Sequence, residues 1–128
     1  MLERSSFDYA ILRIVPRVER AEFINAGLIL HCLTLNFLEA RVHCDERLWR
    51  DLCPGLDVEE TCRHLSTFPK ICAGDADAGP IAQLSRRQRF HWLVSPRSTI
   101  VQVSPVHCGL CESPEAVFED LFTKLVLR

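Results

Sequence analysis

The sequence predicts an α+β fold, with an antiparallel sheet of about four strands, helices packed on one face and a helix at the C-terminus. Three observations support this class. The first third of the chain shows strand-type patterns, the middle changes to helical spacing of apolar residues, and the last third adds one strand-like run before a capped helix. Strands and helices are thus segregated along the chain, as is typical of antiparallel sheets covered by helices.

Three strand-like runs open the chain. Residues 7–15 are rich in β-branched and aromatic side chains and stop at Pro16. Residues 27–33 are apolar on both faces, which indicates a central strand covered from each side. Residues 37–44 alternate apolar with polar side chains, so one face of this strand meets water. We expect the three runs to form an antiparallel meander.

Helical spacing and capping signals fill most of the remainder. The capping boxes are Asp57 with Glu60 and Ser85 with Gln88, in which an N-cap residue precedes its partner by three positions. The expected elements are, in order, a helix over 48–53, a second that starts at 57 and ends or kinks at Pro69, a short third over 85–94, a strand over 99–103 and a final helix that begins at 113–115.

Composition and charge limit the classes of function. The 128 residues are 48% apolar and 25% charged, which fits one hydrophobic core and excludes intrinsic disorder. The net charge is −2, so no strong positive field attracts nucleic acid or anionic lipid. The longest apolar stretch, 26–38, is shorter than the about 20 residues that cross a bilayer. We expect one domain over 1–128 that lies in the cytoplasm and binds neither membrane nor nucleic acid.

The seven cysteines invite a metal or redox interpretation. Their number is odd, and the N-terminus lacks the apolar core of a signal peptide, so we expect reduced thiols. Cys108 and Cys111 form a Cys-x-x-Cys pair, which is half of a zinc site and also the spacing of redox-active thiols. A second ligand pair with suitable spacing is missing. We therefore expect no bound metal, no cofactor and no obligatory disulfide.

Two sequence blocks resemble an uncharacterised bacterial family known only as a domain of unknown function. The first block is FDYAILRIVPRVER followed by EFINAG, within residues 7–27. The second is RFHWLVSPRST followed by SPVH, within residues 89–107. Genes of that family often lie beside genes for HipA-like Ser/Thr kinases. The resemblance thus implies a kinase partner but no reaction.

The link between the first two strands carries charges of both signs. Such a link usually solvates a turn, and it also suits contact with another protein. No nucleophile elbow, HExxH motif or phosphate-binding glycine loop accompanies it. The leading hypothesis is therefore a non-catalytic accessory or regulatory protein that binds another protein, with a HipA-like kinase as the implied partner. The expected partner-binding residues are Arg17, Glu19, Arg20 and Glu22.

The alternative hypothesis is a small anion-binding protein or an enzyme. Arg13 lies in an otherwise apolar strand, where a guanidinium requires an internal carboxylate, such as that of Glu19 or Glu22, or a bound anion. The segment 95–99 offers an arginine and three hydroxyls suited to phosphate or carboxylate, and His107 is the best candidate for a general base. The residues expected to frame this pocket are Arg13, Asn25, Arg97, Ser98 and His107.

Overall fold

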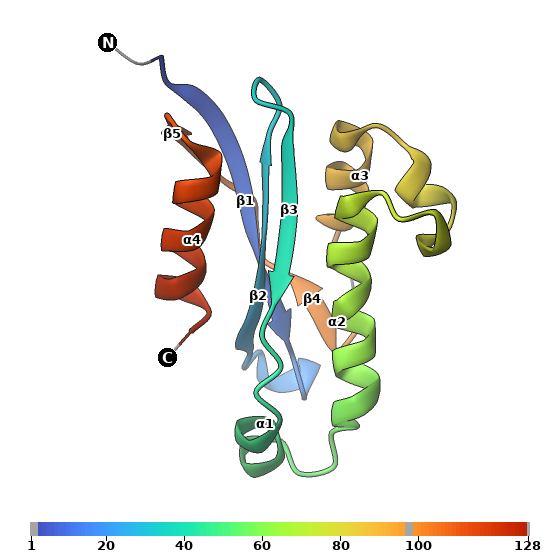
Figure 1. Ribbon diagram of the computed structural model, residues 1–128. Helices are drawn as coiled ribbons and strands as arrows, with labels where there is room; N and C mark the ends of the chain where they lie inside the picture. Colours follow the sequence, from blue (N-terminus) through green and yellow to red (C-terminus); the bar gives the residue numbers. More distant parts are fainter. Residues whose placement is uncertain (1–2, 97–98, 128) are drawn as a thin grey trace.

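The computed structural model describes residues 3–96 and 99–127, and it confirms the α+β class (Figure 1). Its antiparallel sheet follows the order β3-β2-β1-β4, and β5 also pairs with β1. β4 pairs with the end of β1 and β5 with its beginning, so these two short strands share one edge of β1. The five strands are β1 (Ser5–Ile14), β2 (Ile24–Cys32), β3 (Phe37–Val42), β4 (Val101–Val103) and β5 (His107–Cys111).

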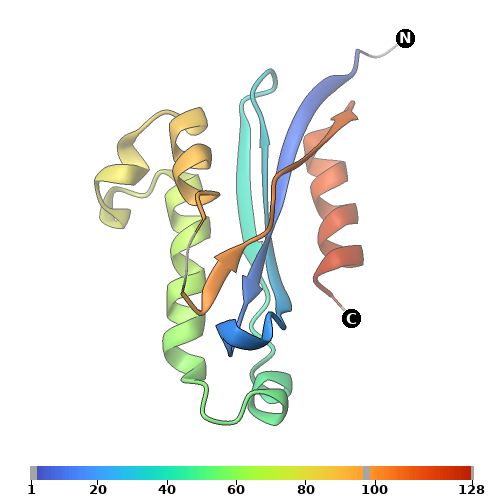
Figure 2. The ribbon, with the colours of Figure 1, turned by 180° about the vertical axis from the view of Figure 1, so that it is seen from behind.

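Helices cover both faces of this sheet (Figures 1 and 2). α2 (Val58–Ala73) and α3 (Arg86–Leu93) pack on one face of the sheet, as predicted for the helices. α1 (Glu46–Leu52) packs at the lower end of the same core. The C-terminal helix α4 (Pro114–Leu125) covers the opposite face. Among the described residues, no helix is long and apolar enough to cross a membrane.

Two hydrophobic cores result from the alternation of side chains along the central strands. On β1, Leu12 and Ile14 are fully buried on the side of α2 and α3, whereas Phe7 is buried beneath α4. On β2, Ile29 faces the first core and Leu30 the second. The apolar pattern on both faces of 27–33 therefore reflects a central strand with a helix layer on each side.

Two local expectations differ from the structure. β5 lies between the predicted strand over 99–103 and the predicted final helix, where no element is expected from the sequence, and α2 continues through Pro69 to Ala73, where an end or a kink is expected. Proline removes one hydrogen bond from a helix, but here Phe68, Ile71 and Cys72 on either side of it are buried in the first core. Tertiary packing therefore outweighs the local preference.

Candidate functional site

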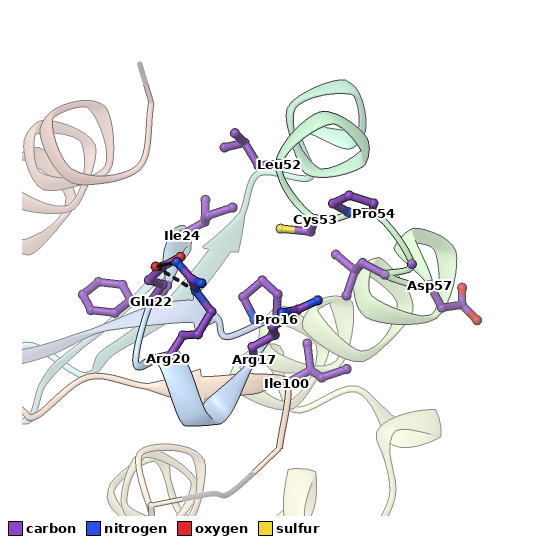
Figure 3. A pocket seen from close by; sticks show the side chains of 13 residues that line it. Pro16, Arg17, Arg20, Glu22, Ile24, Leu52, Cys53, Pro54, Asp57 and Ile100 are labelled. Atoms are coloured by element: carbon purple, nitrogen blue, oxygen red, sulfur yellow. Dashed lines mark hydrogen bonds and ion pairs between the residues drawn. The ribbon is translucent and has the colours of Figure 1, made fainter.

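A pocket of about 840 Å³ opens at the end of the sheet where β1 leads into β2 (Figure 3). Residues from the link 16–24 form one wall, residues from the turn 52–57 between α1 and α2 form another, and Ile100 completes the lining. We call this pocket the end groove. Its walls come from three segments that are far apart in the sequence and meet only in the fold.

Backbone hydrogen bonds within the tight turns fix the walls of the end groove. In the link between β1 and β2, a single 3-10 turn, Val18–Arg20, follows Pro16. In the other wall, Leu56 N donates to the carbonyl of Cys53 at 3.1 Å. Ile100 is held in place because its carbonyl accepts a 2.7 Å hydrogen bond from Val15 N. Hydrogen bonds of the protein's own backbone therefore hold these walls of the groove.

Large apolar side chains are exposed around the end groove. Leu52 is 61% exposed, Phe23 48% and Ile100 43%. Single exposed apolar residues are common on protein surfaces, but a group of them around one concavity is typical of a binding site. The three residues come from three different segments, so the fold assembles the apolar character of the groove.

Charged residues complete the lining. Arg20 donates to the carboxylate of Glu22, with Nε at 2.9 Å from Oε1, and this hydrogen bond lowers the pKa of Glu22. Arg17 lies on the same wall, whereas the carboxylate of Asp57 points away from the opening and caps α2 by accepting from Glu60 N (Figure 3). Three of the four residues expected to contact a partner, Arg17, Arg20 and Glu22, thus line the groove, and Glu19 is exposed on the same turn.

The residues expected to form an anion pocket are separated into groups. Arg13 and Asn25 are directly opposite each other in the β1–β2 register. His107 is instead opposite Tyr9, four residues along β1 from Arg13, which is about 13 Å at strand spacing. Its ring lies 5.3 Å from that of Tyr9. The other two predicted residues, Arg97 and Ser98, lie outside the described residues.

Arg13 is paired in a way that the sequence did not predict. Its guanidinium carbon lies 4.0 Å from the centroid of the Phe23 ring, a cation–π contact. The predicted carboxylate partners do not reach it, because Glu22 is bonded to Arg20 and no carboxylate of residues 3–96 or 99–127 lies within 4.0 Å of Arg13. Asn25 donates to the carbonyl of Leu125 at 3.0 Å and so ties the end of α4 to β2.

A second, smaller pocket lies between the turn that joins β2 to β3 and the start of α3. Its volume is about 260 Å³, and we call it the His31 pocket. The one local sign of this pocket in the sequence is His31, a histidine within the otherwise apolar run 27–33. The lining residues are His31, Leu33, Asn36, Ser85, Arg86 and Arg87.

The Cys-x-x-Cys pair does not converge on one point. Cys108 and Cys111 are three residues apart on β5, and side chains at that spacing on a strand point to opposite faces. The structure shows this directly, since Cys108 is exposed and Cys111 is buried. Within the part of the chain that the structure describes, no group of three or more His, Cys, Asp and Glu side chains could hold a metal ion.

Comparison with known proteins assigns the chain to a family but supplies no activity. The sequence profile of a family described as protein of unknown function (DUF3037) matches residues 9–126. No curated protein and no solved structure shows a significant match.

Proposed function

The chain belongs to the DUF3037 family, and we propose that it is a non-catalytic regulatory protein whose end groove receives a segment of a partner protein. The observation that carries this proposal is the joint exposure of Phe23, Leu52 and Ile100 around a pocket of about 840 Å³. Burial of apolar surface drives most protein association, at about 25 cal/mol per Å² removed from water. An apolar side chain of a partner would cover these three residues.

The charges beside the apolar residues indicate the chemistry of the partner segment. Protein interfaces have an apolar centre and a polar rim, and the end groove combines both. The charges that face its opening are those of Arg17, Arg20 and Glu22, which sum to one positive charge. A segment with an acidic residue next to a large apolar residue fits this arrangement.

The lining supports binding rather than catalysis. Burial raises the pKa of the Cys53 thiol, which keeps it protonated and weakly nucleophilic. Arg20 lowers the pKa of Glu22, which makes this carboxylate a weak base, and Asp57 is occupied as a helix cap. Among the described residues that line it, the groove therefore presents neither an activated nucleophile nor a base suited to neutral pH.

The first partner to test is a HipA-like kinase, as the family resemblance of the two sequence blocks implies. The purified protein would be mixed with a purified HipA-like kinase, and complex formation would be measured by size-exclusion chromatography and calorimetry. We expect a complex at micromolar concentration. Two separate peaks at that concentration would contradict the choice of partner.

A matched pair of variants tests the end groove itself. Leu52→Lys places a charge in the groove, and Leu110→Lys places the same charge at a leucine that is 63% exposed on β5, outside the groove. We expect the first variant to weaken the complex at least tenfold and the second to leave it unchanged. Equal affinities of the two variants would exclude the groove as the contact surface.

The alternative function, a small anion-binding protein or enzyme, retains one supporting observation. The Nε of Arg13 and the Oδ1 of Asn25 are buried without a hydrogen-bond partner among the described residues. A ligand with both donor and acceptor groups would satisfy them. Titration with acetate and acetamide, followed through the side-chain amide signals of Asn25, tests this, and unchanged signals would count against it.

A further inference from the structure

We propose that the His31 pocket is a binding site for a phosphate-type dianion, held by the start of α3, the side chains of Arg86 and Arg87, and His31. The site is separate from the end groove, which lies at the other end of the molecule beside α1 (Figure 1). A volume of about 260 Å³ accommodates a phosphate group with a small organic remainder.

The start of α3 leaves backbone donors free. The capping box uses two N–H groups, since Gln88 N donates to Ser85 Oγ at 3.3 Å and Ser85 N donates to Gln88 Oε1 at 3.1 Å. The N–H groups of Arg86 and Arg87, the first two of the helix, have no intrahelical acceptor. Free N–H groups and the positive end of the helix dipole are the features that bind phosphate at helix starts.

The arginines at this helix start lack an anionic partner. The first turn of α3 contains no acidic residue, and within residues 3–96 and 99–127 no carboxylate lies within 4.0 Å of Arg86 or Arg87. Cations are destabilising at the positive end of a helix dipole. A bound dianion between the arginines and the helix start would be attracted by both.

His31 supplies the independent observation. It is only 6% exposed, it lines the pocket, and its Nε2 is buried with no hydrogen-bond partner in the described part of the chain. Its ring stacks on Phe90 of α3 with centroids 5.1 Å apart, so the ring is held at the helix. A buried nitrogen without a hydrogen-bond partner destabilises the fold unless a ligand or a partner supplies the missing hydrogen bond.

The charges around His31 determine how it responds to an anion. Burial lowers its pKa most, and His91, Arg87 and Arg86 of α3 lower it further, while Asp8, directly opposite on β1, raises it. The lowered pKa favours the neutral imidazole, which carries one N–H that can donate to a phosphate oxygen. The positive charges of two arginines and the partial positive charge of the helix start, about half a unit, together exceed the single negative charge of Asp8. The surroundings of the pocket are therefore net positive. A dianion in the pocket should raise the pKa of His31.

The test is an NMR titration with sodium phosphate at constant ionic strength. We expect saturable shifts of the His31 imidazole and of the Arg86 and Arg87 amides, together with a rise in the pKa of His31. Glycerol 3-phosphate forms a second arm: tighter binding than phosphate indicates a phosphorylated compound, and equal binding indicates that the phosphate group alone is recognised. The absence of saturation at His31 with either probe would overturn the proposal.

Surface arginines provide the matched variants, because exposed side chains can be changed without loss of the fold. We expect the double variant Arg86→Gln with Arg87→Gln to weaken phosphate binding at least tenfold. Arg47→Gln, at an exposed arginine of α1, should have no effect. Equal weakening by Arg47→Gln would show general ionic attraction and would overturn the site, as would undiminished binding by the double variant.

Discussion

Arg41 on β3 donates two hydrogen bonds to the carboxylate of Glu119 on α4, from Nη1 at 2.9 Å and from Nη2 at 2.7 Å. The same guanidinium lies 4.9 Å from the ring centroid of Phe118 and 5.2 Å from that of Phe122. Arg41 therefore joins the C-terminal helix to the sheet through both charge and aromatic contact. Arg41 and Glu119 are 78 positions apart in the sequence, so this contact joins distant parts of the chain at the edge of the second core.

Replacement of Arg41 by alanine should lower the free energy of unfolding by about 1 kcal/mol. Most of this loss comes from the side-chain stem and the two aromatic contacts, because exposed ion pairs contribute little. Urea denaturation of Arg41→Ala, Glu119→Gln and the double variant measures the coupling between them. Lys124→Ala, which breaks an exposed pair within α4, is the control and should change stability less. A loss from Glu119→Gln equal to that from Arg41→Ala would show that the ion pair dominates.

The Arg41–Glu119 pair should also make stability depend on acid pH. The hydrogen bond from Arg41 lowers the pKa of Glu119 below its ordinary value of 4.5. A carboxyl group with a lowered pKa in the folded state stabilises the protein fully above the unfolded value and loses that contribution as pH falls through the folded value. NMR titration should therefore show Glu119 ionised below pH 4.5 in the native protein. In Arg41→Ala its pKa should return toward 4.5; an unchanged pKa would contradict this cause.

Local patterns predicted the elements whose structure depends on local periodicity. The strand over 7–15, the alternation that puts Leu38, Ala40 and Val42 on the first core, and the capping box of α3 follow from adjacent residues, and the structure confirms them. At α2 the structure shows one half of the predicted box, the hydrogen bond from Glu60 N to Asp57 Oδ1. The strand β5 was missed because it is a short edge strand, exposed over most of its length, whose register with β1 depends on pairs such as Ser5 with Cys111. The apolar stripe of α4 predicted that one side of this helix is buried. It did not predict which face of the sheet α4 covers, because that depends on the path of the chain.

The candidate sites were predictable to different degrees. Mixed charge in the link identified Arg17 and Arg20, which line the end groove. Leu52 and Ile100 could not be recognised, because they line one groove only after α1 and the residue before β4 meet that link in the fold. The His31 pocket was missed for the same reason, since its two walls are about 50 residues apart.

Replacement of a left-handed glycine at a helix end by alanine costs about 1 kcal/mol of stability through backbone strain. Gly74→Ala should lower the free energy of unfolding by more than this. Gly74 ends α2 at φ +72°, and an added Cβ would lie 3.1 Å from Nη1 of Arg89. This nitrogen caps α2 by donating to the carbonyls of Ile71 at 3.0 Å and Cys72 at 2.7 Å. The substitution therefore lowers stability in two ways: it strains the backbone at residue 74, and it displaces the Arg89 side chain that caps α2.

Gly55→Ala separates the two effects of the Gly74 substitution. Gly55 has φ +90°, and an added Cβ there would meet no atom within 4 Å, so its cost is backbone strain alone. Thermal and urea unfolding of both variants should show the larger loss for Gly74→Ala. Equal losses would mean that Arg89 moves aside at no cost.

The cysteines should differ widely in their rate of alkylation, because the thiolate is the reactive form and must be accessible. Cys108 is exposed on β5, whereas burial raises the pKa of Cys62 and of Cys72 to about 12. Iodoacetamide at pH 8, followed by peptide mass spectrometry, should label Cys108 first and leave Cys62 and Cys72 unmodified until urea unfolds the chain. Cys108→Ser should abolish the fast phase without a change in the unfolding midpoint. Persistence of that fast phase in Cys108→Ser, with label at Cys62 or Cys72, would show that the first core opens in the native state.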